Sequence, residues 1–253
     1  MTARDLLADG NLTAAVAVQR QDVHCRPADP PARLFLFELL ALAGKLHDAR
    51  DELRLIDSPD PDWPAQRRRF VHLLQAEYRR TALGRPGFLH PPPPHARHRY
   101  RFWSALVHGG GDPVRRLDRA DAAAPHLSGH WNGREFDGLR DADDRFAGVL
   151  EAFAGRHTVW LPLDQLRRVR LAQPAGVLDE VFRPARVTFH TGDEADVTLP
   201  LTYPGSAAAG DDFALGRDAD WPDHGGPVVG VGAKVVLVGD EEEALSDLVQ
   251  LDL

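Results

Sequence analysis

Apolar residues recur every three or four positions in two consecutive stretches near the start of the chain, the spacing that gives a helix one apolar face. The first stretch contains Leu36, Leu39, Leu40 and Ala43, and the second contains Leu46, Ala49, Leu53 and Ile56. Pro30 and Pro31 precede the first stretch, where a helix tolerates proline because its first N–H groups lack intrahelical partners. The pattern predicts two helices joined at Gly44.

The same signature occurs 34 residues earlier, where Gly10, Leu12 and Ala15 correspond to Gly44, Leu46 and Ala49. A period of 34 residues is typical of the tetratricopeptide unit, a helix-turn-helix hairpin. We therefore expect two hairpins, whose inner helices span residues 3–9 and 31–43. A third helix is expected from Trp63 to Leu83, with apolar positions at Phe70, Leu73, Leu74 and Tyr78.

The pattern then changes at a proline-rich stretch, residues 84–98, which we expect to be extended and exposed. Two short helices are expected after it, one from Tyr100 to the three glycines at 109–111 and one closed by Pro125.

Beyond residue 126 the alternation becomes that of strands. One hairpin is predicted with Val187 and Phe189 before a turn at Thr191–Asp193 and Val197 after it. The C-terminal stretch predicts a strand, an acidic turn and a closing strand. The fold class is therefore α+β: tetratricopeptide-like helical hairpins followed by a β-rich α+β domain, either a small, partly open barrel or a bent antiparallel sheet. The expected divisions are residues 1–84, 85–125 and 126–253.

Composition narrows the class of protein. The chain is 43% hydrophobic and 27% charged, and it has one cysteine, Cys25, which excludes an intramolecular disulfide and a thiolate-rich metal site. No apolar run approaches the roughly 20 residues that span a bilayer. The N-terminal segment also lacks the apolar core of a secretion signal. We therefore expect a cytoplasmic bacterial protein that does not insert into a membrane.

Charge argues against a nucleic-acid partner. The net charge is −8, and residues 1–101 hold 16 basic against 12 acidic residues, so the acidic excess lies in the rest of the chain. A nucleic-acid binder needs a concentrated basic face. The triplet Arg67, Arg68 and Arg69 could meet an acidic protein surface, although a solvated helix face is the commoner explanation.

Candidate chemistry is sparse. Asp141, Asp143 and Asp144 could hold a divalent cation or form an acid–base pair, but we favour Asp141 or Asp143 as the cap of a helix over residues 143–153. The histidines of the proline-rich stretch, at 90, 95 and 98, have no acidic or thiol residue near them. No phosphate-binding loop or nucleophile elbow is present. We therefore expect no catalytic, cofactor-binding or metal-binding residues.

Several segments, in order, resemble the ImpE/TagJ family, also called SciE-type virulence proteins. They include "LFLFELLALAGKLHDARDEL", "WNGREFDGLRDADDRFAGVLEAF", "VWLPLDQLRRV", "VFRPARVTFHTGDEADVTLPLTYPGS", "DDFALGRDADW" and "GVGAKVVLVGDEE". The positions that match the family motifs are Phe136, Asp137, Asp141, Asp143, Arg145, Trp160, Pro162, Arg183, Pro184, Tyr203, Pro204, Gly205 and Trp221. The tryptophans at 131, 160 and 221 are interpreted as core residues, or as binding anchors if they are exposed.

The resemblance implies a non-enzymatic adaptor of bacterial type VI secretion. Such a protein would contact the small, TssB-type subunit of the contractile sheath and the ClpV-type AAA+ ATPase. In the helical part, a concave groove could accept a partner helix. The candidate partner-binding residues are Arg33, Phe37, Arg67 and Arg68, with a core role for Phe37 left open. The alternatives are a metal-dependent hydrolase that uses the three aspartates and a helical-repeat scaffold for another bacterial assembly. The sequence does not set the oligomeric state.

Overall fold

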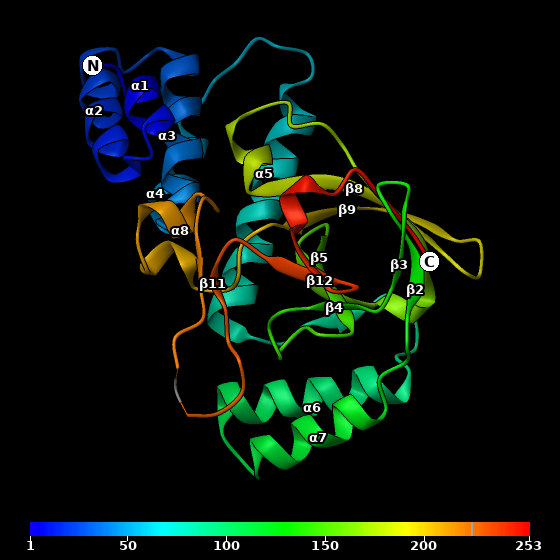
Figure 1. The fold of residues 1–253 in the computed structure, drawn as a ribbon. Helices are drawn as coiled ribbons and strands as arrows, with labels where there is room; N and C mark the ends of the chain where they lie inside the picture. The colour runs from blue at the N-terminus through cyan, green and yellow to red at the C-terminus, as the bar shows by residue number, and fades with distance from the viewer. Residues whose placement is uncertain (224) are drawn as a thin grey trace.

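The computed structural model describes residues 1–223 and 225–253, and it divides into a helical front and a β-rich back (Figure 1). The front consists of α1 (Ala3–Ala8), α2 (Leu12–Cys25), α3 (Pro30–Leu42), α4 (Leu46–Arg54) and α5 (Trp63–Tyr78), which continues into a π-helical turn at Arg79–Leu83. The predicted hairpins are confirmed. They join α1 to α2 and α3 to α4, and the predicted third helix is α5 with its π-helical turn.

Local residues fix the ends of these helices. Thr2 forms a capping box with Asp5, and Asn11 accepts a hydrogen bond from the Ala14 N–H at 3.0 Å. Gly10 and Gly44 have φ angles of 84° and 66°, in the left-handed region that favours glycine. The repeated glycine therefore marks the sharp turn between the two helices of each hairpin.

A third helical hairpin covers the opposite side of the molecule and consists of α6 (Pro94–His108) and α7 (Pro113–Ala122) (Figure 1). The prediction that the chain stays extended to residue 98 is wrong. Pro94 occupies the first turn of α6, where its ring suits the helix. His95 and Arg99 consequently lie in the helix and are buried.

The back is built on an open nine-stranded sheet with the order β1-β6-β5-β9-β8-β7-β14-β2-β3. Its members are β1 (Gly87–Phe88), β2 (Ser128–Trp131), β3 (Arg134–Asp137), β5 (Val149–Ala154), β6 (His157–Pro162), β7 (Leu166–Leu171), β8 (Phe182–Phe189), β9 (Glu194–Pro200) and β14 (Gln250–Asp252). Only β1 and β6 pair in parallel among these strands. Because β1 and β3 are edge strands and do not pair with each other, the sheet is not a closed barrel. The predicted hairpin is β8–β9.

A smaller sheet has the order β13-β12-β4, formed by β4 (Leu139–Asp141), β12 (Val235–Val238) and β13 (Glu241–Ala244). Two predictions fail in this part of the chain. The acidic residues expected in a turn form β13, and the helix expected over residues 143–153 is a turn followed by β5. Strand β5 is buried on both faces, so its apolar run lacks the alternation that identifies a half-buried strand.

No helix in the described part of the chain is long and apolar enough to cross a membrane. Several short elements complete the back. These elements are η2 (Leu163–Gln165), η3 (Val177–Glu180), η4 (Ser206–Ala208), α8 (Asp211–Ala214), β10 (Ala219–Asp220), β11 (Val231–Gly232) and η5 (Leu245–Asp247).

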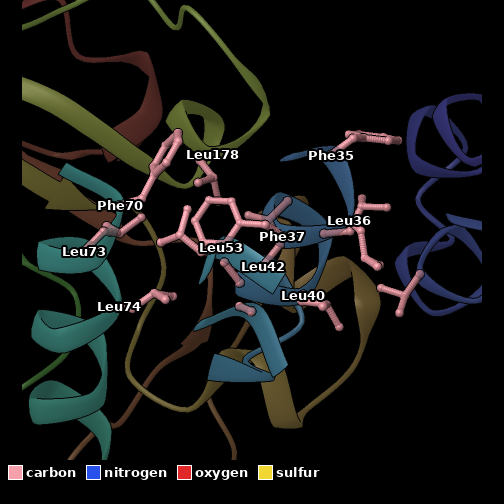
Figure 2. Packing of buried hydrophobic residues seen from close by; sticks show 14 of the residues in the cluster. Phe35, Leu36, Phe37, Leu40, Leu42, Leu53, Phe70, Leu73, Leu74 and Leu178 are labelled. Atoms are coloured by element: carbon pink, nitrogen blue, oxygen red, sulfur yellow. The ribbon is translucent and has the colours of Figure 1, made fainter. Parts of the chain in front are cut away.

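Front and back share a hydrophobic core. Phe37 of α3 and Phe70 of α5 have ring centroids 4.8 Å apart, and Leu178 of η3 belongs to the same buried cluster (Figure 2). Phe153 and Phe182 add two strands of the large sheet to it. A separate cluster joins Trp103 of α6 to Trp160 of β6, with centroids 5.7 Å apart. The sheet therefore holds both helical regions by apolar contact.

Candidate functional site

The most unusual feature of the interior is a set of ionisable side chains beneath the helical front. It begins at the turn after β4, which the sequence presents as a cluster of aspartates. Asp141 accepts a hydrogen bond from the Asp143 N–H at 2.9 Å, and Asp143 accepts one from the Arg145 N–H at 2.7 Å. These contacts stabilise a turn rather than cap a helix, which corrects the interpretation made from the sequence.

Asp143 is fully buried and forms an ion pair with Arg145. The Nη2 atom of Arg145 lies 2.5 Å from Oδ2 of Asp143. Arg145 also donates to the Gly230 carbonyl at 2.9 Å, and the Gly230 N–H donates to Asp143 at 2.7 Å. A Cβ on Gly230 would lie 2.5 Å from the Tyr203 ring, so this approach requires glycine. The turn is thereby fastened to the loop before β11.

Tyr203 connects this turn to the end of β9. Its hydroxyl donates to Asp141 at 2.8 Å and accepts from the Val235 N–H at 3.2 Å. Burial raises the pKa of Asp141 to about 7, with Asp143 adding to the rise and Lys234 opposing it. Burial also raises the pKa of Tyr203. Burial thus disfavours the charged form of Asp141, whereas the hydrogen bond from Tyr203 lowers the pKa of Asp141 and favours its carboxylate.

A second group of charges lies next to the first. Oε2 of Glu151 on β5 accepts from Nε of Arg80 at 2.9 Å and from Nζ of Lys234 at 3.0 Å. Arg80 also donates to the Thr202 carbonyl and lies 3.2 Å from Glu77. Burial opposes ionisation of Glu151, but the two cations outweigh it and hold the pKa of Glu151 below its usual value. Burial also lowers the pKa of Lys234.

We call these eight residues the buried charge network: Glu77, Arg80, Asp141, Asp143, Arg145, Glu151, Tyr203 and Lys234. It joins the end of α5 and its π-helical turn to β5, to the turn after β4 and to the segment before β12. Removing one partner of such a network leaves an uncompensated buried charge, which is strongly destabilising. The network therefore fixes the position of the helical front on the sheet.

Comparison with known proteins identifies the family. A family model described as ImpE protein matches residues 133–252, the part that carries most of the network. The whole chain is 31% identical to the type VI secretion system accessory component TagJ of Pseudomonas aeruginosa, over 91% of that protein.

The chain belongs to the ImpE/TagJ family.

The fold agrees with a solved structure. The crystal structure of protein VPA1032 from Vibrio parahaemolyticus superposes with a TM-score of 0.88, covering 99% of this chain and 96% of that one. The sequences are 22% identical, so this likeness concerns the fold alone.

The ImpE/TagJ motif positions separate into two groups. Asp141, Asp143, Arg145 and Tyr203 come together in the buried charge network, and Trp160 packs 5.8 Å from the adjacent Phe146 ring. The remaining positions lie elsewhere. Phe136, Pro162 and Arg183 are buried, Pro184, Pro204 and Trp221 are partly buried, and Asp137 and Gly205 are exposed. Trp131 is buried, as expected for a core residue.

Each of the three clustered aspartates accepts hydrogen bonds from other groups of the protein. Asp144 accepts from Arg140 at 2.8 Å and from the Val228 N–H at 2.7 Å, in addition to the contacts of Asp141 and Asp143 described above. His95 contacts Asp164 at 3.0 Å, whereas His90 lies 3.8 Å from Asp193. Within residues 1–223 and 225–253, no three His, Cys, Asp or Glu side chains are grouped to hold a metal ion.

The candidate partner-binding residues do not form one surface. Phe37 has no exposed area, so its proposed role as a surface contact is corrected to a core role. Arg33 lies 2.6 Å from Glu52 and donates to the Pro27 carbonyl. Arg67 and Arg68 are exposed on α5.

Four members of the network were not identified from the sequence: Glu77, Arg80, Glu151 and Lys234. The sequence does contain a signal for two of them, because Glu151 and Lys234 each interrupt an apolar run, "VLEAF" and "AKVVLV". A charged residue inside such a run is buried only when it is paired. The partner of each residue depends on the tertiary fold, so the sequence does not identify it.

Proposed function

We propose that the protein is a non-enzymatic accessory component of bacterial type VI secretion. In this proposal it acts in the cytoplasm as an adaptor between the small, TssB-type sheath subunit and the ClpV-type AAA+ ATPase. The observation that carries the proposal is the 31% identity to the accessory component TagJ over the whole chain. The helical front supports it, because stacked helical hairpins present broad surfaces to partner polypeptides.

The chemistry of the interior supports a role without catalysis. The hydrolase alternative depends on Asp141, Asp143 and Asp144, and these carboxylates accept hydrogen bonds from backbone N–H groups, arginines and a tyrosine. They stabilise the turn and the loop beside it. The buried charge network is thus explained by its contribution to the stability of the fold.

The exposed arginines of α5 support a partner surface on that helix of the front. Leu178 of η3 lies beside Phe37 and Phe70 and fills the space between α3 and α5, so Phe37 is not open to the partner helix expected in the groove of the inner helices (Figure 2). Arg33 reaches a partner only by leaving Glu52. Arg67 and Arg68 are exposed, and no acidic side chain in the described part of the chain forms an ion pair with either.

The test is co-purification from cells that produce the protein naturally. We expect the tagged protein to retain the small sheath subunit and the ATPase, and the Arg67→Glu/Arg68→Glu variant to retain much less of at least one. The matched control is Arg115→Glu/Arg119→Glu, which makes the same charge change on exposed positions of α7 and should retain both. Capture of neither protein by the parent chain would refute the adaptor role.

A further inference from the structure

A hollow of about 930 Å³ lies at the end of α5, between its π-helical turn, strand β1 and the turn that joins β5 to β6. Its lining consists of Arg79, Ala82, Arg85, Pro86, Gly87, Phe88, Leu89, His108, Ala154, His157, Thr158 and Val159. The lining residues come from sequence positions more than 70 residues apart, so the hollow is formed by the tertiary fold.

The sign of its charge is opposite to that of the whole chain. The lining includes two arginines and two histidines and no acidic residue, although the net charge of the protein is −8. Arg79, Arg85 and His157 are exposed. Neither arginine forms an ion pair with an acidic residue in the part of the chain that the structure describes, whereas the neighbouring Arg80 is held by Glu151 and Glu77. The two arginines are therefore available to an external anion.

A second hollow continues the basic surface along α5. It has a volume of about 370 Å³ and includes Arg68 and His72 in its lining. Gly155 lines this hollow and Ala154 lines the first, so the two flank the turn between β5 and β6. Asp196, the acidic residue in this lining, is 2.8 Å from Arg186.

The basic side chains share one face of the helix. Arg68 and His72 are four residues apart on α5, and Arg79, the first residue of the π-helical turn, follows seven residues later, so all three lie on the same side of this helical segment. At 1.5 Å per residue, Arg68 and Arg79 span roughly 16 Å. We call this surface the α5 groove and define it by Arg68, His72, Arg79, Arg85 and His157.

The larger hollow also offers apolar and backbone contacts. Phe88, Leu89, Ala154 and Val159 line it beside the basic residues, and Leu89 is 39% exposed. Strand β1 is the last strand on this side of the nine-stranded sheet, so one edge of its backbone has no neighbouring strand among residues 1–223 and 225–253. An extended peptide can pair with such an edge.

We propose that the α5 groove binds an extended, acidic segment of a partner protein. Carboxylates of that segment contact Arg79, Arg85 and Arg68, and apolar side chains between them contact Phe88 and Leu89. The acidic strand of this chain is a poor candidate occupant, because Glu243 of β13 is already 2.5 Å from Arg134. This inference rests on the proposed adaptor role and specifies the chemistry of the segment that one partner presents.

The test measures fluorescence anisotropy of a labelled nine-residue peptide of alternating glutamate and valine, with the full chain. We expect saturable binding that weakens as salt increases, because exposed charges are screened. Arg79→Glu/Arg85→Glu should weaken binding at least ten-fold, and Arg115→Glu/Arg119→Glu should leave it unchanged. The peptide with glutamine in place of glutamate should bind at least ten-fold more weakly to the parent chain.

Three results would overturn the inference. The first is unchanged peptide binding by the Arg79→Glu/Arg85→Glu variant, and the second is an equal loss of peptide affinity in that variant and in the Arg115→Glu/Arg119→Glu control. The third is a change from dimer to monomer in the Arg79→Glu/Arg85→Glu variant, measured by light scattering. The last would identify a second copy of the chain as the occupant. The peptide assay does not involve the secretion proteins, so failure of co-purification with intact peptide binding removes the adaptor role and leaves the groove assignment standing.

Discussion

The helical front and the β-rich back are stabilised in different ways. In residues 1–76 the buried side chains are apolar apart from Gln19, which donates to the Ala32 carbonyl at 2.9 Å. The back buries Asp141, Asp143, Arg145, Glu151 and Lys234 in addition to its apolar core. The front therefore depends on shape and helical spacing, whereas the back also depends on matched charges. Different kinds of substitution should damage the two regions.

The largest effect is expected from Glu151→Ala in the back. The substitution removes the shared acceptor of Arg80 and Lys234, and leaves two buried cations with fewer partners. We expect the free energy of unfolding to fall by about 4 kcal/mol, measured by urea denaturation.

The matched control is Arg186→Ala, which removes an exposed ion pair with Asp196 on the same sheet. Its urea midpoint should not change, because exposed pairs contribute little. A loss of less than about 1 kcal/mol in Glu151→Ala, within the range of ordinary surface pairs, would show that the network does not stabilise the back as described.

A somewhat smaller effect is expected from Phe37→Ala in the front. The ring is fully buried beside Phe70, so its removal leaves a cavity and should lower the free energy of unfolding by about 3 kcal/mol. The control is Leu55→Ala, because Leu55, the residue that follows α4, is 61% exposed. Both variants are measured by urea denaturation followed by tryptophan fluorescence. Equal midpoints for the two would contradict the core role of Phe37.

The smallest effect is the change in the free energy of unfolding with pH that Asp141 causes in the back. The pKa of Asp141 is about 7 in the folded protein, above its usual value of 3.8. The folded state therefore keeps a proton that the unfolded state releases, and the contribution of Asp141 to stability falls as the pH rises from about 4 to 7.

Asp141→Asn removes this dependence and retains an oxygen that can accept from Tyr203. Relative to the parent, the variant should gain about 2 kcal/mol of stability between pH 5 and pH 7, measured by urea denaturation at each pH. The control Asp118→Asn, at an exposed position of α7, should change in stability between pH 5 and pH 7 as the parent does. If the difference in free energy of unfolding between Asp141→Asn and the parent stays constant from pH 5 to pH 7, the raised pKa of Asp141 is contradicted.

The front could be predicted from sequence because its information is local. The positions of Gly10 and Gly44, the apolar spacing and the prolines before α3 each act within one or two helical turns, and together they specify the hairpins. The β8–β9 hairpin was predicted for the same reason, since Gly192 occupies its turn with a φ of 93°. Confirmed predictions thus depend on short-range constraints.

The failures involve residues whose partners are distant in sequence. Strand β5 was mistaken for a helix because neighbours on both faces bury it. The sequence left both a surface and a core role open for Phe37, because Leu178, which lies 141 positions later in the same buried cluster, does not affect the spacing of apolar residues in α3. Arg80 and Glu151 pair across 71 positions. The candidate site was therefore less predictable than the fold.

The packing of Leu178 beside Phe37 and Phe70 affects any attempt to study the N-terminal helices separately. A fragment ending at residue 84 would lack this leucine together with Val181 and Phe182, which belong to the same cluster. Its aromatic rings would then be open to water and would adhere to many unrelated apolar ligands. Partners captured by such a truncated version would report on a face that the intact chain keeps covered.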